Sequence, residues 1–149
     1  MFRGTIGLIG RALLCAIFVV SALMNKIPHF DTTVERMTSA GIPQAKLMLI
    51  GAIGFMLLGS LLVITGIGAR IGALLLLVFL AAATYFFHDF WTIDAAQEVV
   101  TGAVDISGAD ARMNEMVHFM KNVAIGGALL TILAKRPSNA YEVDDGYLD

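Results

Sequence analysis

Two groups of polar residues lie at the ends of apolar stretches, and their side chains could bind a ligand or move a proton. His88 and Asp89 follow one stretch, and His118, Lys121 and Asn122 lie near the start of another. The last three stand at positions i, i+3 and i+4, which share one face of a helix. Histidine and lysine can donate hydrogen bonds to a polar ligand, and an aspartate can relay protons. Any chemistry of this chain is expected in these two groups.

The stretches around these residues have the composition of a membrane protein. Of the 149 residues, 58% are hydrophobic and 15% charged, and the mean hydropathy is +0.80. A soluble domain of this size cannot bury so much apolar surface. Apolar runs at 5–24, 47–67, 71–87 and 117–134 are long enough to cross a bilayer. We predict an all-α integral membrane four-helix bundle over residues 1–136, followed by an acidic mobile tail at 137–149.

The connection between the first two runs carries signals for a short helix. Thr32 and Glu35 have the spacing of a capping box, and Gly41 supplies a C-cap before Pro43. Apolar residues between 30 and 37 fall at i, i+4 and i+7, so one face is apolar. We predict a short interfacial helix here, lying in the membrane surface. A second short helix is conceivable at 95–100, within the acidic connection from Thr92 to Arg112.

Small residues and single polar residues within the runs indicate packing. Ala52, Gly59 and Gly66 recur every seven residues, which favours close contact with a neighbouring helix. The one cysteine, Cys15, is interpreted as a packing residue and forms neither a disulfide nor a redox pair within the chain. Arg11 interrupts the first run, which argues against a cleaved signal peptide. We interpret Arg11 as an interface anchor whose side chain extends toward the headgroups.

Four alternating spans would bring the polar residues to one membrane face. A lysine inside a span costs about 2.5–3.5 kcal/mol at a helix centre and usually faces a partner. We therefore predict that Lys121 pairs with Asp89 or shares a small polar pocket with it. The candidate cluster at this face, which forms either a tie between helix ends or a ligand site, consists of Asn25, Lys26, His88, Asp89, Trp91, His118, Lys121 and Asn122.

A metal site is a further interpretation of the same cluster. His88 and His118 on different helices, with Asp89, could ligate zinc or copper, and three methionines lie nearby at 113, 116 and 120. No motif spacing supports this site, and methionines at such spacing usually form a packing face, so we predict no metal. The net charge of -2 excludes a nucleic-acid binder.

Basic residues give a preferred orientation. Lys and Arg gather in short cytoplasmic flanks of membrane proteins. The side that holds both termini carries Arg3, Arg11, Arg70, Lys135 and Arg136, against Lys26, Arg36, Lys46 and Arg112 on the other. We predict a cytoplasmic-membrane protein with both termini in the cytoplasm.

Several ordered segments resemble the DoxX family of small bacterial integral membrane proteins. The resemblance runs from about residue 7 to 133 and rests on Gly10–Leu14 running into Ile17–Ala22 and Lys26-Ile27, on Met37-x-x-x-Gly41-Ile42-Pro43, on Gly66 with Arg70, on His88–Trp91 and on Phe119–Leu130. It implies a four-helix membrane protein with a loose link to redox chemistry. Some relatives are subunits of a thiosulfate:quinone oxidoreductase, and others are similar to anchors in oxidative-stress assemblies. Many carry a glutamate where this chain has Met56, and the 92–112 connection is longer than the family pattern.

Three functions follow as hypotheses. The first is a non-catalytic subunit or anchor in a redox or oxidative-stress membrane complex, because the chain has no recognisable nucleophile, cofactor motif or thiol pair. The second is a quinone-linked oxidoreductase component, with quinone as its cofactor or substrate. The third is transport of a small solute by an oligomer. Expected partners are the lipid bilayer and either other proteins of a membrane complex or further copies of the chain.

Overall fold

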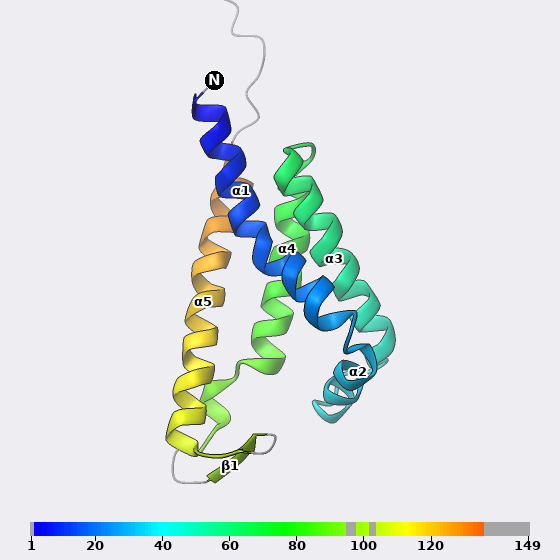
Figure 1. Ribbon diagram of the computed structural model, residues 1–149, viewed down its shortest axis with the longest axis vertical. Helices are drawn as coiled ribbons and strands as arrows, with labels where there is room; N and C mark the ends of the chain where they lie inside the picture. The colour runs from blue at the N-terminus through cyan, green and yellow to red at the C-terminus, as the bar shows by residue number, and fades with distance from the viewer. Residues whose placement is uncertain (1, 95–97, 102–103, 136–149) are drawn as a thin grey trace, which may run out of the picture.

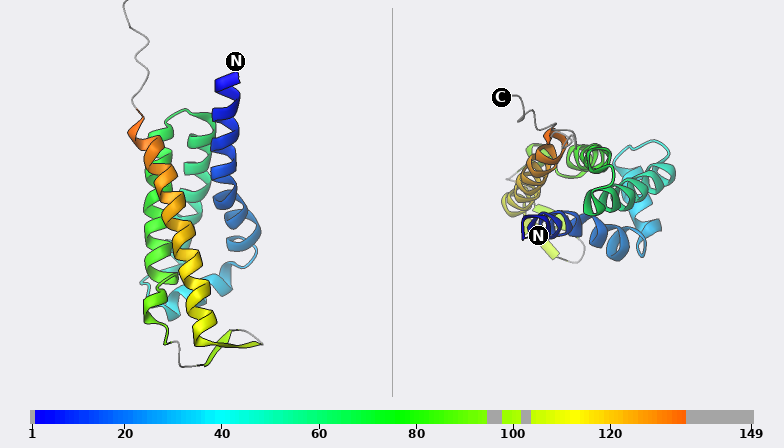
Figure 2. Two further views of the ribbon diagram at one scale, coloured as in Figure 1. Left: turned by 90° about the vertical axis from the view of Figure 1, so that its left-hand side faces the viewer. Right: turned by 90° about the horizontal axis from the view of Figure 1, so that it is seen from above.

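A computed structural model describes residues 2–94, 98–101 and 104–135. The first half of the chain forms three helices. Helix α1 (Phe2–Val20) continues into the π-helical turn η1 (Ser21–Lys26), the short helix α2 (Phe30–Ser39) follows, and α3 (Ala45–Thr65) returns. In Figures 1 and 2, α3 runs antiparallel to α1, and α2 lies across the end of both. The predicted short helix between the first two spans is thus confirmed.

The second half adds two long helices and a small hairpin. Helix α4 (Ala69–Phe87) leads into the 3-10 turn η2 (Phe90–Thr92), and α5 (Gly108–Ala134) closes the fold. Strands β1 (Glu98–Thr101) and β2 (Val104–Ser107) pair antiparallel, with Glu98 opposite Ser107. The hairpin and η2 both contact the start of α5 (Figure 1). Below, the membrane face that carries this hairpin is called the hairpin face.

The connections differ from the sequence-based expectations in two places. Residues 98–100 lie in a strand and not in a short helix, while 95–97 and the tail predicted at 137–149 lie outside the described residues. The last helix begins at Gly108, nine residues before the predicted 117. Its N-cap is Ser107, whose side chain accepts a hydrogen bond from the Asp110 amide. This Ser-x-x-Asp signal was present in the sequence and was missed.

Helix α2 has the predicted end but not the predicted start. It begins at Phe30 with His29 as N-cap, so Thr32 lies inside the helix and forms no capping box with Glu35. At the other end Gly41 has a φ of 75°. The Gly41 amide donates to the Thr38 carbonyl and the Ile42 amide to the Met37 carbonyl, which is a Schellman motif.

A tight turn places α3 directly beside α4. Gly66 and Gly68 both have positive φ, 80° and 73°, so the chain reverses within three residues. The two helices then cross closely: a Cβ added to Gly72 would lie 2.6 Å from the Gly59 carbonyl oxygen. The predicted small-residue contact is real at Gly59, and its partner is Gly72, which the sequence reading did not single out.

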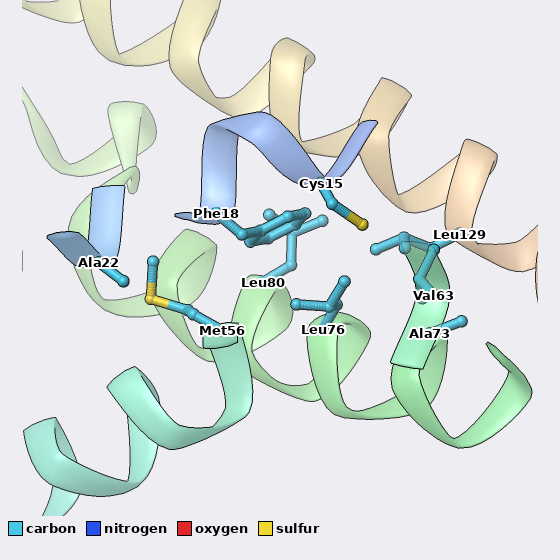
Figure 3. Packing of buried hydrophobic residues seen from close by; sticks show 9 residues of the cluster. All are labelled: Cys15, Phe18, Ala22, Met56, Val63, Ala73, Leu76, Leu80 and Leu129. Atoms are coloured by element: carbon cyan, nitrogen blue, oxygen red, sulfur yellow. The ribbon is translucent and has the colours of Figure 1, made fainter. Parts of the chain in front are cut away.

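All four long helices contribute to one apolar core (Figure 3). Its buried residues are Cys15, Phe18, Ala22, Met56, Val63, Ala73, Leu76, Leu80 and Leu129. Cys15 is fully buried among them, in agreement with its interpretation as a packing residue. Many large apolar side chains remain on the outside of the helices, Leu13, Leu61 and Leu130 among them. An apolar core inside an apolar exterior is the arrangement of a bundle that is solvated by lipid.

Four of the described helical segments are long and apolar enough to cross a membrane. They cover 4–26, 45–65, 69–92 and 108–134. The start of α1 and the end of α5 lie at the same end of the bundle (Figure 2), as four alternating spans require. The hairpin and η2 lie at the opposite end, with α2 toward the same side. The predicted all-helical membrane bundle is therefore confirmed, with the β-hairpin as an addition in the last connection.

Candidate functional site

The centre of the polar cluster is a histidine pair between the end of α4 and α5. His88 Nδ1 lies 2.7 Å from Glu115 Oε2, and the two side chains are 23% and 24% exposed. The His118 ring stacks on the His88 ring with 5.1 Å between centroids and 6° between planes. The contact is an ion pair when His88 is protonated and a hydrogen bond when it is neutral. It joins the two helices at the hairpin face.

Glu115 was absent from the sequence-based candidate list. It stands three residues before His118 and seven before Asn122, so all three share one face of α5. That spacing was visible in the sequence. Lys121 also shares a helix face with His118, and the sequence analysis expected the partner of α5 on that face.

A second polar contact joins α4 and α5 one turn deeper. Asn122 Nδ2 donates to Thr84 Oγ1 at 2.9 Å, and the Thr84 hydroxyl donates to the Leu80 carbonyl at 2.7 Å. Both side chains are partly buried, so each polar atom gains a partner that lipid does not offer. This contact explains why an asparagine is found inside a membrane-crossing helix.

Removing this contact is expected to weaken the bundle measurably. The variants Thr84→Val and Asn122→Ala should each lower the free energy of unfolding by about 0.6 kcal/mol, and at most about 1.7 kcal/mol, the range measured for hydrogen bonds between membrane helices. The double variant should lose less than the sum of the two. Unfolding in mixed detergent micelles measures all three. Thr131→Val is the control, because Thr131 bonds only within α5 in the described structure. If the double variant loses as much free energy of unfolding as the two single variants together, Thr84 and Asn122 do not interact.

Three aromatic residues that follow the two histidines in sequence pack on one another at the hairpin face. Trp91, Phe90 and Phe119 lie edge to face with one another, with centroids 5.2–5.9 Å apart. The guanidinium of Arg36 on α2 lies 5.6 Å from the centre of the Phe87 ring, which ties α2 to the end of α4. Aromatic rings at a helix end are typical of the membrane–water interface. They place the polar cluster near headgroup depth.

The predicted pair of Asp89 and Lys121 is wrong. The Thr92 hydroxyl donates a hydrogen bond to Asp89 Oδ2 at 3.0 Å, so this carboxylate has its partner within the η2 turn. Lys121 is exposed, and over the described residues the one ion pair found joins His88 to Glu115. The physical reason is the helix face: Glu115, His118 and Asn122 point to α4, and Lys121 stands beside that face.

The variant Lys121→Met is therefore expected to leave the midpoint of thermal unfolding unchanged. In contrast, Glu115→Gln should lower the free energy of unfolding by about 1 kcal/mol, because it removes the charge that pairs with His88. Differential scanning fluorimetry in one detergent compares the two variants. A larger loss of thermal stability for Lys121→Met than for Glu115→Gln would support the pair of Asp89 and Lys121 that the sequence predicted.

The remaining predicted residues lie apart from this centre. Asn25 is exposed, and Lys26 is half-buried at the end of η1 with Arg36 as its charged neighbour. No hydrogen bond or ion pair within the described residues joins either side chain to the histidine pair. Arg11 lies at the opposite face, where its Nη1 atom would be 2.6 Å from a Cβ on Gly66, so it folds onto the α3–α4 turn. The predicted cluster thus divides into a histidine centre and separate residues.

The metal interpretation finds no support in the geometry. Among the residues that the structure describes, no group of three histidine, cysteine, aspartate or glutamate side chains is arranged to hold an ion. The Nδ1 atom of His88 is already engaged by Glu115.

Four apolar spans around a shared core, with polar contacts near one face, define an integral membrane protein of the four-helix type. The chain belongs to the DoxX family, whose sequence pattern matches residues 6–89. It is similar to the inner membrane protein YphA of Escherichia coli (strain K12), with 29% identity over 135 residues that cover 91% of this chain and 86% of that protein. No solved structure matches the chain. The family and this relative support a place in the cytoplasmic membrane.

Proposed function

We propose that this DoxX protein is a non-catalytic subunit or anchor of a redox or oxidative-stress membrane complex. The observation that supports it best is the pairing of the polar residues with one another. His88 with Glu115, Asn122 with Thr84, and Asp89 with Thr92 each use their polar groups to fix helices and turns. Groups used in this way hold α4 and α5 in place. They also position the hairpin and η2, which contact α5 at the hairpin face.

We expect the partner protein to bind at the hairpin face. Both termini, which lie at the other face, are expected in the cytoplasm. The connection from Thr92 to Arg112 is acidic in sequence, with Asp94, Glu98, Asp105 and Asp110. Trp91 is 52% exposed beside this connection. Half-exposed tryptophan is a residue type that interfaces favour. Partner proteins of basic character would complement the acidic segment.

Co-purification tests the proposal directly. The full-length protein, tagged and expressed in its own host, is isolated in a mild detergent, and the expected result is a partner in constant ratio to the chain. Trp91→Ala should reduce the amount of partner while the protein stays folded. Tyr85→Ala is the control, because Tyr85 is a similarly exposed aromatic residue on the last turn of α4. A chain that always elutes alone would contradict an anchoring role.

A quinone-linked role is the second candidate, and the stacked histidines favour it. The imidazoles of His88 and His118 stack in parallel, and Phe90, Trp91 and Phe119, which are close to them in sequence, form a second group of rings on which a quinone could stack. An imidazole N–H could donate to one quinone oxygen. Lipid extraction of the pure protein should then yield quinone, and His118→Leu should abolish it. Absence of quinone from the wild-type protein, with none bound on addition, would eliminate this candidate.

A further inference from the structure

A groove opens between the short helix α2 and the start of α3, away from the histidine centre. It encloses about 420 Å³ and is lined by Val34, Thr38, Gln44, Ala45, Lys46, Leu47 and Ile50. This volume lies within the range of small-ligand sites in proteins. The lining is largely apolar, and the groove is shallow and mostly open to its surroundings. None of these residues belongs to the contacts that join α4 and α5.

The lining residues that α3 contributes change from polar to apolar along the helix. Lys46 and Gln44 lie at the start of α3, and Ile50 lies one helical turn further along, about 6 Å deeper at 1.5 Å per residue. Since the apolar span of α3 begins at Ala45, we expect Lys46 at headgroup depth and Ile50 at acyl-chain depth. The groove therefore changes from charged to apolar in the direction in which a lipid changes from headgroup to chain.

The ammonium group of Lys46 is available to an anion. Lys46 is exposed, and within the described part of the chain it forms no ion pair. The α2 carboxylates Asp31 and Glu35 are exposed and do not pair with it. The first turn of α3 has no side-chain cap, so the partial positive charge of the helix N-terminus adds to that of Lys46.

From these observations we infer that the groove binds one anionic phospholipid, with its phosphate at Lys46 and an acyl chain along Val34, Leu47 and Ile50. The charge complementarity of Lys46 selects an anionic headgroup over a zwitterionic one. The apolar lining makes the ligand a lipid and not a free phosphate ion, because a free ion gains nothing from Leu47 or Ile50.

Native mass spectrometry of the full-length protein in detergent tests this inference. Dioleoyl phosphatidylglycerol and dioleoyl phosphatidylcholine, which differ in headgroup charge, are added at equal concentration. The expected result is one tightly held phosphatidylglycerol, with about fivefold preference over phosphatidylcholine, the size of one lysine at a membrane surface. Lys46→Gln should remove the preference. Lys121→Gln, which removes an exposed lysine from α5, should keep it.

Two further measurements test whether the ligand is a lipid or a free phosphate ion. Ile50→Trp should fill the apolar end and lower the occupancy of both lipids while the protein remains folded by circular dichroism. Inorganic phosphate should not displace the bound lipid. Displacement by phosphate would overturn the assignment to a lipid. A phosphatidylglycerol preference that survives Lys46→Gln, or that Lys121→Gln abolishes equally, would overturn the site itself.

Discussion

Replacing Gly72 by alanine is expected to lower the free energy of unfolding by about 1–3 kcal/mol, the usual loss from overpacking. The new Cβ would lie 2.6 Å from the Gly59 carbonyl oxygen and 2.8 Å from Leu62 Cβ. Both neighbours are fixed to the α3 backbone, so the two helices must separate. Separation weakens the packing of Leu76 and Val63, which are fully buried in the shared core.

The measurement is unfolding of purified protein in mixed micelles, followed by circular dichroism. Gly54→Ala is the matched control on α3, because a Cβ there would meet nothing within 4 Å. It should leave stability unchanged or raise it slightly, since alanine is the better helix former. Equal stability of Gly72→Ala and Gly54→Ala would mean that α3 and α4 do not cross at Gly59.

Replacing Met56 by glutamate is expected to cost about 3 kcal/mol, the scale for a carboxylate at the centre of a membrane helix. Met56 is fully buried in the core shown in Figure 3, beside apolar residues of α1 and α4. Ser60 lies one turn away and could donate one hydrogen bond, but a hydroxyl does not neutralise a charge. Arg11 lies near Gly66, ten residues or about 15 Å further along α3, which is beyond ion-pair distance.

This substitution also tests whether the core can hold a carboxylate. The resemblance to the DoxX family implies a glutamate in place of Met56, and such a carboxylate needs a partner that the apolar residues of the core do not supply. Met56→Leu is the control and should cost less than about 1.5 kcal/mol. Thermal unfolding and the folded fraction on size exclusion measure both variants. A Met56→Glu protein as stable as Met56→Leu would show that the core can pair a carboxylate.

The spans could be predicted from sequence because lipid imposes a simple rule. An apolar run of bilayer length must be helical, since no other structure pairs its backbone groups there. The starts and ends were harder. The apolar run near Val117 marks where the last helix enters lipid, while the helix itself begins at Gly108, after the N-cap Ser107 and its local polar contacts. Hydropathy locates membrane entry, and capping residues locate the helix.

The polar site could be placed at one membrane face, but its partners could not be chosen. His118 shares one face of α5 with Glu115 and Asn122, and another with Lys121, so helical spacing leaves both options. The position of α4 decides between them, and that position depends on core packing around Leu80 and Leu129. A sequence contains the spacing within each helix but not the rotation of one helix against another.

Helix α5 is longer than a membrane is thick, and this difference has a mechanical consequence. Its 27 residues extend about 40 Å, against about 30 Å for the hydrocarbon core. No proline interrupts it between Gly108 and Ala134. At its far end the Leu133 carbonyl accepts a hydrogen bond from Arg70 Nε at 3.0 Å, on the α3–α4 turn side. Helix α5 therefore connects the hairpin at one membrane face to Arg70 at the other without a break. A displacement of the hairpin would be transmitted along this one helix to the contact between Arg70 and Leu133.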